Sequence, residues 1–566
     1  MNIQGSEILG SSFAENNSIL GNFIGTDVTG TRALGNYGSG ITIGGEHNTV
    51  GGQAAGARNV ISGNVGGGVF LGLGSSNTVQ GNLIGTTATG TQDLGNTGDG
   101  IRLLNSSGNL IGGATAAARN IISGNEGSGI SIEAISRFVG LGANNNVVQG
   151  NFIGTDISGV AELGNTSQGI AVINAPSTTI VENMVSANGR SLSGTYGAGT
   201  NRDGIIIAYQ SSGTVVQGNK IGVNLNGVAL GNTGNGVTVL YASGVTVGGG
   251  SQGQGNTIAN NDWNGVLVVD FAGVYATGDV IRGNSISANG MLGIDLSRFD
   301  FPYDGITAND AGDSDVGANN LQNFPLIVSA TSTANTSTIT GTLNSTPSTA
   351  FTLDFYSNVT ADPSGFGEGA VYLGSGIVTT DITGNASYSI NLPIGVLAGH
   401  KVTATATSAS GTSEFGGNTI VVAQNTSPTS LSLSLDQATI RENDVVKLSG
   451  TFVDSDLLDT HIVTIRWGDG SEDTVLNLAA GVVSFSNVAH QYLDDNPSGT
   501  SSDLIAISVT VVDSYTANAL ATTNVRVNNV APVAFTHSID TSDVNENDVV
   551  TLAGSFVDIG SRIAIP

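Results

Sequence analysis

One sequence feature limits the possible folds more than any other, a short glycine-led segment that returns along the first half of the chain. In each copy a Gly is followed by a branched apolar residue, a variable residue and another apolar residue, as in GITI and GIRL. The copies begin at Gly40, Gly68, Gly100, Gly129, Gly169, Gly204, Gly236, Gly265 and Gly293. A unit this short cannot bury its own apolar face, so its repetition predicts a stacked solenoid with one coil per copy.

A longer repeat of two coils is superposed on the first. The segment GNFIGTD begins at Gly21 and again at Gly150, with GNLIGTT at Gly81 between them, and a second kind of segment, ARNVISGN, alternates with these. Alternation within the short strands places Ile, Val and Leu inward. The Gly before each strand suits either a positive φ or a close approach of backbone.

Polar residues recur at the corners of the predicted coils. Asn22, Asn82, Asn151 and Asn219 occupy matching places, where stacked amides can hydrogen-bond along the solenoid axis. The acids of the GTD segments, Asp27 and Asp156, are expected to form Asx turns in a protruding loop. A metal ladder is excluded there because Thr87 and Asn224 hold the matching places.

The pattern GNxIGTDxxGTxxLGNxGxGIxI resembles the right-handed parallel β-helix family over roughly residues 1 to 300. The resemblance implies the fold. It leaves the function open, because the family includes pectin and alginate lyases, glycoside hydrolases, epimerases, phage tailspikes, adhesins and non-catalytic surface proteins.

The second half has a different texture, with short alternating strands separated by turn residues. We expect the β-helix over 1–308, an acidic junction at 309–321 and an immunoglobulin-like β-sandwich at 322–424. The sequence is therefore predicted to be all-β, a right-handed parallel β-helix solenoid followed by tandem β-sandwich domains.

Residues 430–530 contain the segments WGDGSED, HQY and ISVTVVD. They resemble the polycystic kidney disease (PKD) family of β-sandwich modules, and a cadherin-like sandwich is the alternative. Trp467 and Tyr492 are expected in its core. The segment from Asn545 then repeats the segment from Arg441 at an offset of 104 residues, so we interpret 531–566 as the start of a truncated further repeat and the chain as a piece of a longer protein.

Composition and charge limit the partners. The formal net charge of −28 repels phosphate backbones and anionic membranes, so nucleic acid is excluded as a partner, and no apolar run is long enough to insert into a membrane. The absence of Cys excludes disulfides, zinc-thiolate sites and Cys nucleophiles. The beginning MNIQGSEILG has no signal-peptide pattern, and a secreted or cell-surface location is an expectation from the modular organisation.

The predicted solenoid offers little that points to catalysis. A glycosidase needs two carboxylates roughly 5 to 10 Å apart. Asp99 and Asp203 occupy the same place in coils that are three apart, about 14 Å by the spacing between strands. The lone His47 in a turn is expected to be solvated. We therefore predict no catalytic residue.

Two Arg residues of the solenoid lie beside these acids. Arg102 with Asp99, and Arg202 with Asp203, are weak candidates for sugar-contacting pairs, and ordinary surface charge pairs are the alternative.

Two acidic loops are candidate calcium sites. The first contains Asp310, Asp313, Asp315 and Asn319, in the segment DAGDSDVGAN with a Gly for a sharp turn. The second joins Glu442 to Asp454, Asp456 and Asp459. Closely spaced oxygen ligands on a Gly-containing loop suit Ca²⁺, and a plain acidic linker is the alternative.

The function hypothesis that follows is a non-enzymatic extracellular surface or adhesion protein. Its β-helix is a rigid display or glycan-binding rod, its partner a polysaccharide or cell-surface glycan, and its sandwiches are spacers or adhesive modules with structural Ca²⁺. The alternative is a polysaccharide-active lyase, hydrolase or epimerase that uses the β-helix groove.

Overall fold

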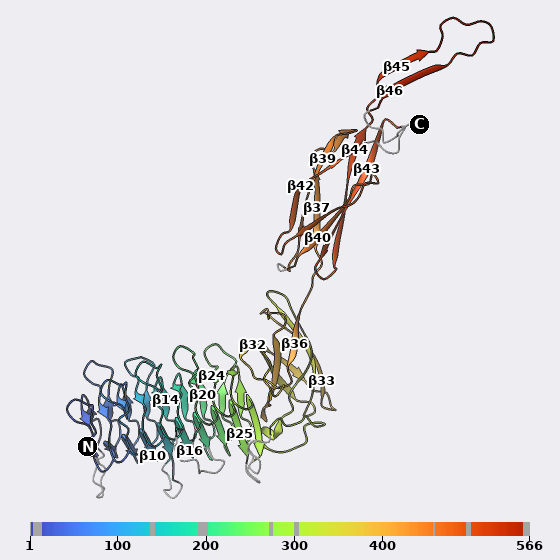
Figure 1. Cartoon of the computed structure of the whole chain (residues 1–566). Coiled ribbons are helices and arrows are strands. Elements are labelled where there is room, and N and C mark those ends of the chain that lie inside the picture. The colour runs from blue at the N-terminus through green and yellow to red at the C-terminus, as the bar shows by residue number, and fades with distance from the viewer. Residues whose placement is uncertain are drawn as a thin grey trace. The chain divides into compact units, whose positions relative to one another are not determined.

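The computed structural model divides the chain into two compact units, residues 1–422 and residues 423–566. The first contains a parallel β-solenoid followed by a further β-module (Figure 1), and the second contains antiparallel sheets. The residues that the structure describes are 2–3, 14–135, 142–190, 202–270, 276–298, 305–456, 459–493 and 500–558.

Each coil of the solenoid contributes one short strand to each of three parallel sheets, here named A, B and C. Sheet A contains β1 (Asn2–Ile3), β4 (Ile41–Ile43), β7 (Val69–Gly72), β10 (Ile101–Leu104), β13 (Ile130–Glu133), β16 (Ile170–Ile173), β19 (Ile205–Ala208), β22 (Val237–Leu240), β25 (Val266–Asp270) and β28 (Ile294–Arg298). Sheet B contains β2 (Ser18–Ile19), β5 (Thr49–Gly51), β8 (Thr78–Gln80), β11 (Leu110–Gly112), β14 (Val147–Gln149), β17 (Thr179–Val181), β20 (Val215–Gln217), β23 (Thr246–Gly248) and β26 (Val280–Arg282). Sheet C contains β3 (Phe23–Ile24), β6 (Val60–Ile61), β9 (Leu83–Ile84), β12 (Ile121–Ile122), β15 (Phe152–Ile153), β18 (Met184–Val185), β21 (Lys220–Ile221), β24 (Thr257–Ala259) and β27 (Ser285–Ser287).

The solenoid core is a column of inward aliphatic side chains, as the alternation predicts. In the coil of β10, the inward residues Ile101, Leu103 and Ile111 are all fully buried. The Gly before each sheet A strand is required by close packing. A Cβ on Gly100 would lie 2.5 Å from Cγ2 of Ile122 and 2.7 Å from the carbonyl oxygen of Gly129. Any larger residue at this position would push neighbouring coils apart.

Asparagine ladders run along the corners of the solenoid and confirm the prediction of stacked amides. Asn82, for example, donates its backbone N–H and its Nδ2–H to Oδ1 of Asn120 in the next coil, both over 3.0 Å. The ladder before sheet C contains Asn22, Asn59, Asn82, Asn120, Asn151, Asn183, Asn219, Asn256 and Asn284. The ladder after sheet C contains Asn36, Asn64, Asn96, Asn125, Asn165, Asn188, Asn232, Asn261 and Asn289. These bonds satisfy corner groups that are buried away from water.

The protruding GTD loops stack on one another and cover part of sheet C. The N–H of Ala88 donates to the carbonyl of Gly30, and that of Ile157 donates to the carbonyl of Gly90, each over 2.9 Å. The loops pack on an outward row of sheet C that is buried beneath them, made up of Val60, Leu83, Ile121, Phe152 and Met184. The Asp of each GTD segment does organise its loop, but through wider bonds than the predicted Asx turn, which would accept the N–H two residues on. Oδ1 of Asp156 accepts the backbone N–H groups of residues 160 and 161, four and five positions along the chain.

The β-module that follows the solenoid is a largely antiparallel sheet curled around its own core. Its strand order is β32-β31-β34-β36-β29-β30-β33, with β35 paired to β34, and the end strands β32 and β33 lie in contact. The strands are β29 (Leu326–Ser332), β30 (Ser337–Asn344), β31 (Ala350–Asn358), β32 (Val371–Thr379), β33 (Asn385–Leu392), β34 (Lys401–Ser408), β35 (Gly411–Thr412) and β36 (Thr419–Ala423), preceded by the 3-10 turn η1 (Ala318–Leu321). Its sandwich-like shape agrees with the predicted all-β class.

This module closes the open end of the solenoid. The N–H of Ile281 in sheet B donates to Oγ1 of Thr412 over 2.9 Å. In sheet C, Ile286 exchanges two backbone hydrogen bonds with Gly369, of 2.8 and 3.0 Å. In sheet A, the N–H of Leu296 donates to Oε1 of Glu414 over 3.0 Å. All three sheet edges therefore end on this module, which acts as a cap on the last coil.

Buried polar groups reinforce the cap. Asn289, the last member of its ladder, donates N–H and Nδ2–H to Oε1 of Glu368, over 3.2 and 2.8 Å. Burial raises the pKa of Glu368 to about 7. Arg282 forms a bidentate ion pair with the fully buried Asp354, with Nη2 at 2.9 Å from Oδ1. Phe415 joins the solenoid core cluster, so cap and solenoid share one hydrophobic core.

In the described residues of the second unit, two facing sheets are ordered β37-β39-β42 and β38-β44-β43-β40-β41, and a two-stranded sheet follows them. Trp467 and Tyr492 are fully buried between them, which confirms their predicted place in a core. The strands are β37 (Thr429–Leu435), β38 (Thr439–Arg441), β39 (Val445–Val453), β40 (His461–Arg466), β41 (Thr474–Leu478), β42 (Ser484–Gln491), β43 (Ser502–Asp513) and β44 (Asn518–Asn528). The hairpin of β45 (Val533–Ile539) and β46 (Leu552–Val557) pairs in the same register as β37 and β39, 104 residues further along the chain.

Candidate functional site

The two acids among the solenoid candidates lie in separate coils and make structural contacts. Asp99 accepts the backbone N–H of Ser128 over 2.8 Å, and Asp203 accepts that of Asn235 over 2.8 Å. Each acid therefore fastens its corner to the next coil. Burial raises the pKa of Asp99, and it raises the pKa of Asp203 to about 6. Asp99 belongs to the coil of β10 and Asp203 to the coil of β19. The coils of β13 and β16 lie between them.

The two arginines also have structural surroundings. Arg102 forms an ion pair with Glu133 on the neighbouring strand, and both side chains are partly exposed. The backbone of Arg202 packs closely against two glycines. A Cβ on Gly189 would lie 2.7 Å from the carbonyl oxygen of Arg202, and a Cβ on Gly234 would lie 2.8 Å from its carbonyl carbon. The arrangement brings no acid pair of glycosidase spacing together among these four residues.

The first acidic loop gathers three of its four candidates. Asp310, Asp313 and Asp315 each place a carboxylate oxygen within 4.8 Å of the others, and all three are partly exposed. Asn319 does not join them. Its side chain lies in the cap, where Oδ1 accepts the N–H of Asp279 over 2.9 Å and Nδ2 donates to the carbonyl of Thr412 over 3.0 Å.

The carboxylates of this first loop already hold the loop together. Oδ2 of Asp310 accepts the Ser314 hydroxyl over 2.6 Å. Asp313 accepts the backbone N–H of Asn323 and the hydroxyl of Ser345, each over 2.8 Å. The carboxylates therefore have a structural role in the loop.

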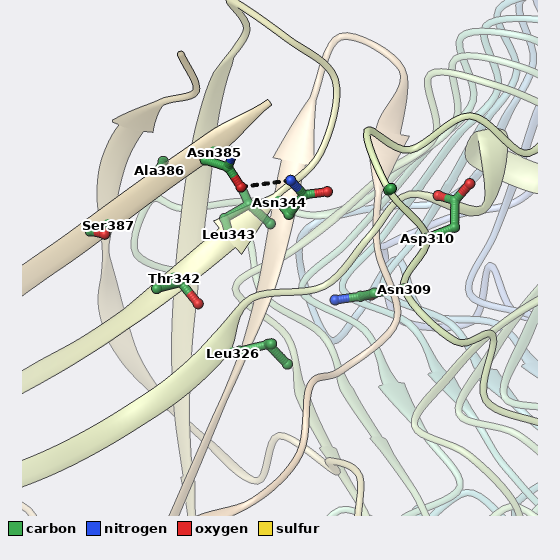
Figure 2. Close-up of a pocket in the computed structure, with 10 residues that line it drawn as sticks. Asn309, Asp310, Leu326, Thr342, Leu343, Asn344, Asn385, Ala386 and Ser387 are labelled. Carbon is green, nitrogen blue, oxygen red and sulfur yellow. Dashed lines mark hydrogen bonds between the residues drawn. The ribbon is translucent and has the colours of Figure 1, made fainter. Parts of the chain in front are cut away.

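A depression of about 500 Å³ lies beside Asp310. Figure 2 shows the hydrogen-bonded amides of Asn344 and Asn385 on one side and Asp310 on the other. The amides hold the loop in place, because Oδ1 of Asn344 accepts the N–H of Gly312 over 2.8 Å and Asn309 bonds the backbone of Phe324 in both directions. The lining groups are therefore engaged in the fold.

The second acidic cluster contains only two of the four residues predicted for it. Asp454 and Asp459 come together with Asp513, each offering an oxygen within 4.8 Å of the others, and all three are buried. Asp456 and Glu442 lie outside this group. Oδ2 of Asp456 accepts the N–H of Thr426 over 2.6 Å, and Oε2 of Glu442 accepts that of Val530 over 3.1 Å.

Three strand ends build this cluster. Asp454 directly follows β39, Asp459 precedes β40, and Asp513 is the last residue of β43. Sequence reasoning missed Asp513, although the acid that ends the apolar run ISVTVVD marks the strand end at which it lies.

The cluster has uncompensated acceptor oxygens. Asp454 contacts Nε2 of His461 over 2.9 Å, and Asp513 accepts Nδ2–H of Asn425 over 3.0 Å. Among the described residues, Oδ2 of Asp459 and Oδ1 of Asn425 are buried without a hydrogen-bond partner. Burial, together with the neighbouring carboxylates, raises the pKa of Asp459.

The donor set fits a hard cation. Carboxylates such as these three are ligands that Ca²⁺ prefers, at about 2.3 to 2.6 Å from the ion. Ligands on opposite sides of such an ion are separated by roughly twice that distance, which agrees with the spacing within the cluster. Buried like charges at this separation are costly unless a cation or protons compensate them.

Comparison with known proteins leaves the chain without an assigned family. No protein-family model matches it, and no curated protein is similar to it in sequence. Among solved structures, a two fibronectin type-III domain segment from chicken tenascin is 13% identical and covers 36% of this chain and 99% of its own, with a TM-score of 0.21. The fibronectin(III)-like modules of Clostridium thermocellum CbhA are 16% identical and cover 36% of this chain and 93% of theirs, with a TM-score of 0.16. Such scores support no inference about function.

Within the residues that the structure describes, no helix has the length and apolar character needed to cross a bilayer.

Proposed function

We propose that this protein is a non-enzymatic extracellular surface or adhesion protein whose solenoid is a rigid rod for display or glycan binding. The observation that carries the proposal is that the polar residues of the solenoid form hydrogen bonds between its own coils. Asn ladders join successive coils, and Asp99 and Asp203 each fasten a corner. A capped stack of this kind maintains a long, regular surface.

The alternative, a polysaccharide-active enzyme, requires acid and base groups that converge on one bond. The described solenoid residues place the candidate acids in separate coils, and the ion pair of Arg102 with Glu133 neutralises the charge nearest to Asp99. These contacts favour the structural role.

The experiment is a screen of the full chain against neutral and acidic polysaccharides, in which both the bound fraction and product release are measured. We expect binding without turnover. Release of reducing or unsaturated sugars that is lost in the Asp203→Asn variant would replace this proposal with the enzymatic one. An Asp473→Asn variant, at an exposed surface ion pair, is the matched control.

We further propose that Asp454, Asp459, Asp513 and Asn425 bind a structural Ca²⁺ in the second unit. The two partnerless oxygens of Asp459 and Asn425 support this site more strongly than the number of acids. Bound Ca²⁺ would tie three strand ends to the segment before β37, stiffening the second unit.

The calcium proposal predicts a change in melting temperature. At a free Ca²⁺ concentration one hundred times Kd, the second unit should gain about 2.7 kcal/mol, and a chelator should remove this gain. The Asp459→Asn and Asp513→Asn variants should lose the response, whereas Asp473→Asn should keep it. An equal response in all variants would contradict the site. A second Ca²⁺ site, at the cluster of Asp310, Asp313 and Asp315, stays a prediction. A stoichiometry of two bound Ca²⁺ per chain would support it.

A further inference from the structure

Among the residues that the structure describes, sheet B is the one solenoid sheet in which every strand keeps an outward residue that is at least partly exposed. The stacked loops cover sheet C in the coils of β6 to β18. On sheet A the strands β19 and β25 are wholly buried, so the partly exposed outward residues Glu133, Ile173 and Leu240 of other strands form no continuous face. On sheet B the first residue of every strand is partly exposed, from Thr49 in β5 to Val280 in β26. Sheet B therefore gives the solenoid a continuous open side.

The strands of this open side contain no acid, although the protein as a whole has a formal charge of −28. One exposed carboxylate, that of Glu182, lies beside them, directly after β17. The nine strands of sheet B contain no Asp or Glu, and their single charged residue, Arg282, is paired with Asp354 of the cap. In a protein with 44 acidic residues, nine neighbouring strands without an acid distinguish this face from the rest of the surface. A charged polymer gains nothing from such a strip and is repelled by its surroundings.

The side chains of the strip form a regular, low relief. The register aligns one outward row of hydroxyl and methyl groups, made up of Ser18, Thr49, Thr78, Leu110, Val147, Thr179, Val215, Thr246 and Val280. Beside this row, Gln80 donates its amide to the carbonyl of Gly112 over 2.8 Å, and Gln217 donates to that of Gly248 over 2.9 Å. The amide of Gln149 instead donates to Oε2 of Glu182 over 3.1 Å. Hydroxyl, amide and methyl groups therefore lie side by side along the strip.

The dimensions of the strip select the kind of partner. Nine strands at about 4.8 Å give a length of roughly 38 Å, and three residues at about 3.3 Å give a width of roughly 10 Å. The resulting area of roughly 400 Å² is half of the about 800 Å² per partner that a stable protein interface needs. A second copy of this acidic chain is therefore a poor occupant, whereas a single extended polymer chain matches a strip this long and narrow.

We propose that the outer face of sheet B binds an uncharged linear polysaccharide that lies along the solenoid axis. Thr, Ser and Gln side chains exchange hydrogen bonds with sugar hydroxyls, and the Val and Leu methyl groups contact the C–H faces of the rings. Each coil contributes a weak contact, so affinity grows with the length of the polymer. The inference rests on the proposed function, of which it names the binding face and the ligand class.

The test compares two variants that carry the same added charge. The face variant has Thr78→Glu, Thr179→Glu and Thr246→Glu on sheet B. The control variant has Thr31→Glu, Thr91→Glu and Val160→Glu, which lie on exposed parts of the stacked loops. Both are the full chain, and equal melting temperatures for the face variant and the control show that the solenoid is intact. Binding to insoluble cellulose is measured as depletion of the protein from solution. Binding to a soluble neutral β-glucan is measured as retardation in a native gel that contains the polymer. Alginate in the same gel assay is the anionic comparator.

We expect the wild type and the control variant to bind the neutral polymers and the face variant to lose at least tenfold in affinity, with little retention on alginate. Equal binding by the face variant would overturn this inference and leave the glycan-binding rod in place. Binding to alginate alone, or to no neutral polymer, would also overturn it. Product release would instead reject the proposed non-enzymatic function, a separate readout of the same samples.

Discussion

The Asn96→Ala substitution tests whether the amide ladders hold the coils together. Asn96 is fully buried, and its Oδ1 accepts the N–H of Asn64 over 3.1 Å and the Nδ2–H of Asn64 over 2.8 Å. Its own Nδ2–H donates to Oδ1 of Asn125 over 2.8 Å. Alanine leaves the Asn64 N–H buried without an acceptor, a cost of about 1 to 3 kcal/mol. It also removes three further bonds of about 0.5 to 1.5 kcal/mol each, those with Nδ2 of Asn64, Oδ1 of Asn125 and the carbonyl of Ile61. We expect a local loss of about 3 kcal/mol.

Hydrogen exchange at the Asn64 amide measures this loss directly. A change of about 3 kcal/mol in local opening corresponds to roughly a hundredfold faster exchange. The matched control is Asn36→Ala at the exposed first member of the same ladder. There the Asn36 backbone N–H still reaches Oδ1 of Asn64, so we expect less than about a threefold change at the Asn64 amide. Equal exchange in the two variants, or unchanged exchange in Asn96→Ala, would refute the reasoning.

Two further predictions concern the cap. Arg282→Met leaves the buried Asp354 carboxylate unpaired and should destabilise the first unit by about 3 to 5 kcal/mol, whereas Arg466→Met, at an exposed pair, should cost about 1 kcal/mol or less in the same thermal melts. Burial raises the pKa values of Glu368 and Asp279 to about 7 from their ordinary values of 4.5 and 3.8. A raised pKa in the folded state means that their stabilising contribution is complete below about pH 4 and is lost as the pH rises through about 7. The melting temperature of the first unit should therefore fall across this range, and a Glu368→Gln, Asp279→Asn double variant that keeps the full slope would contradict the assignment.

Local pattern was sufficient to predict the solenoid and its ladders. Inward aliphatic residues such as Ile101 repeat at each strand, and a buried strand face permits only one register. Because every coil stacks on a copy of itself, the place of Asn82 in one coil also predicts the place of Asn120 in the next. Repetition thus turned a local pattern into a prediction of tertiary contacts.

Contacts between unlike segments lay beyond this reasoning. Glu414 and Thr412 are 118 and 131 residues from their partners Leu296 and Ile281, and nothing in their local sequence marks them as part of a cap. Asn319 was predicted to join a cation loop, but the fold places its amide against the last coil. In the second unit, the membership of Asp513 in the cluster depends on how three strand ends converge, which spacing along the chain does not specify.

The cap imposes an order on assembly. A chain that emerges from its N-terminus completes the last coil by residue 298, yet the groups that close the edges of sheets B and A arrive with Thr412 and Glu414, more than one hundred residues later. During that interval the sheet edges are templates for pairing with other chains, and coil stacking proceeds without its final contacts. Folding of the solenoid is therefore vectorial, with the cap as its termination step, and slow or interrupted synthesis of residues 299–414 lengthens the period in which the nascent rod is exposed to aggregation.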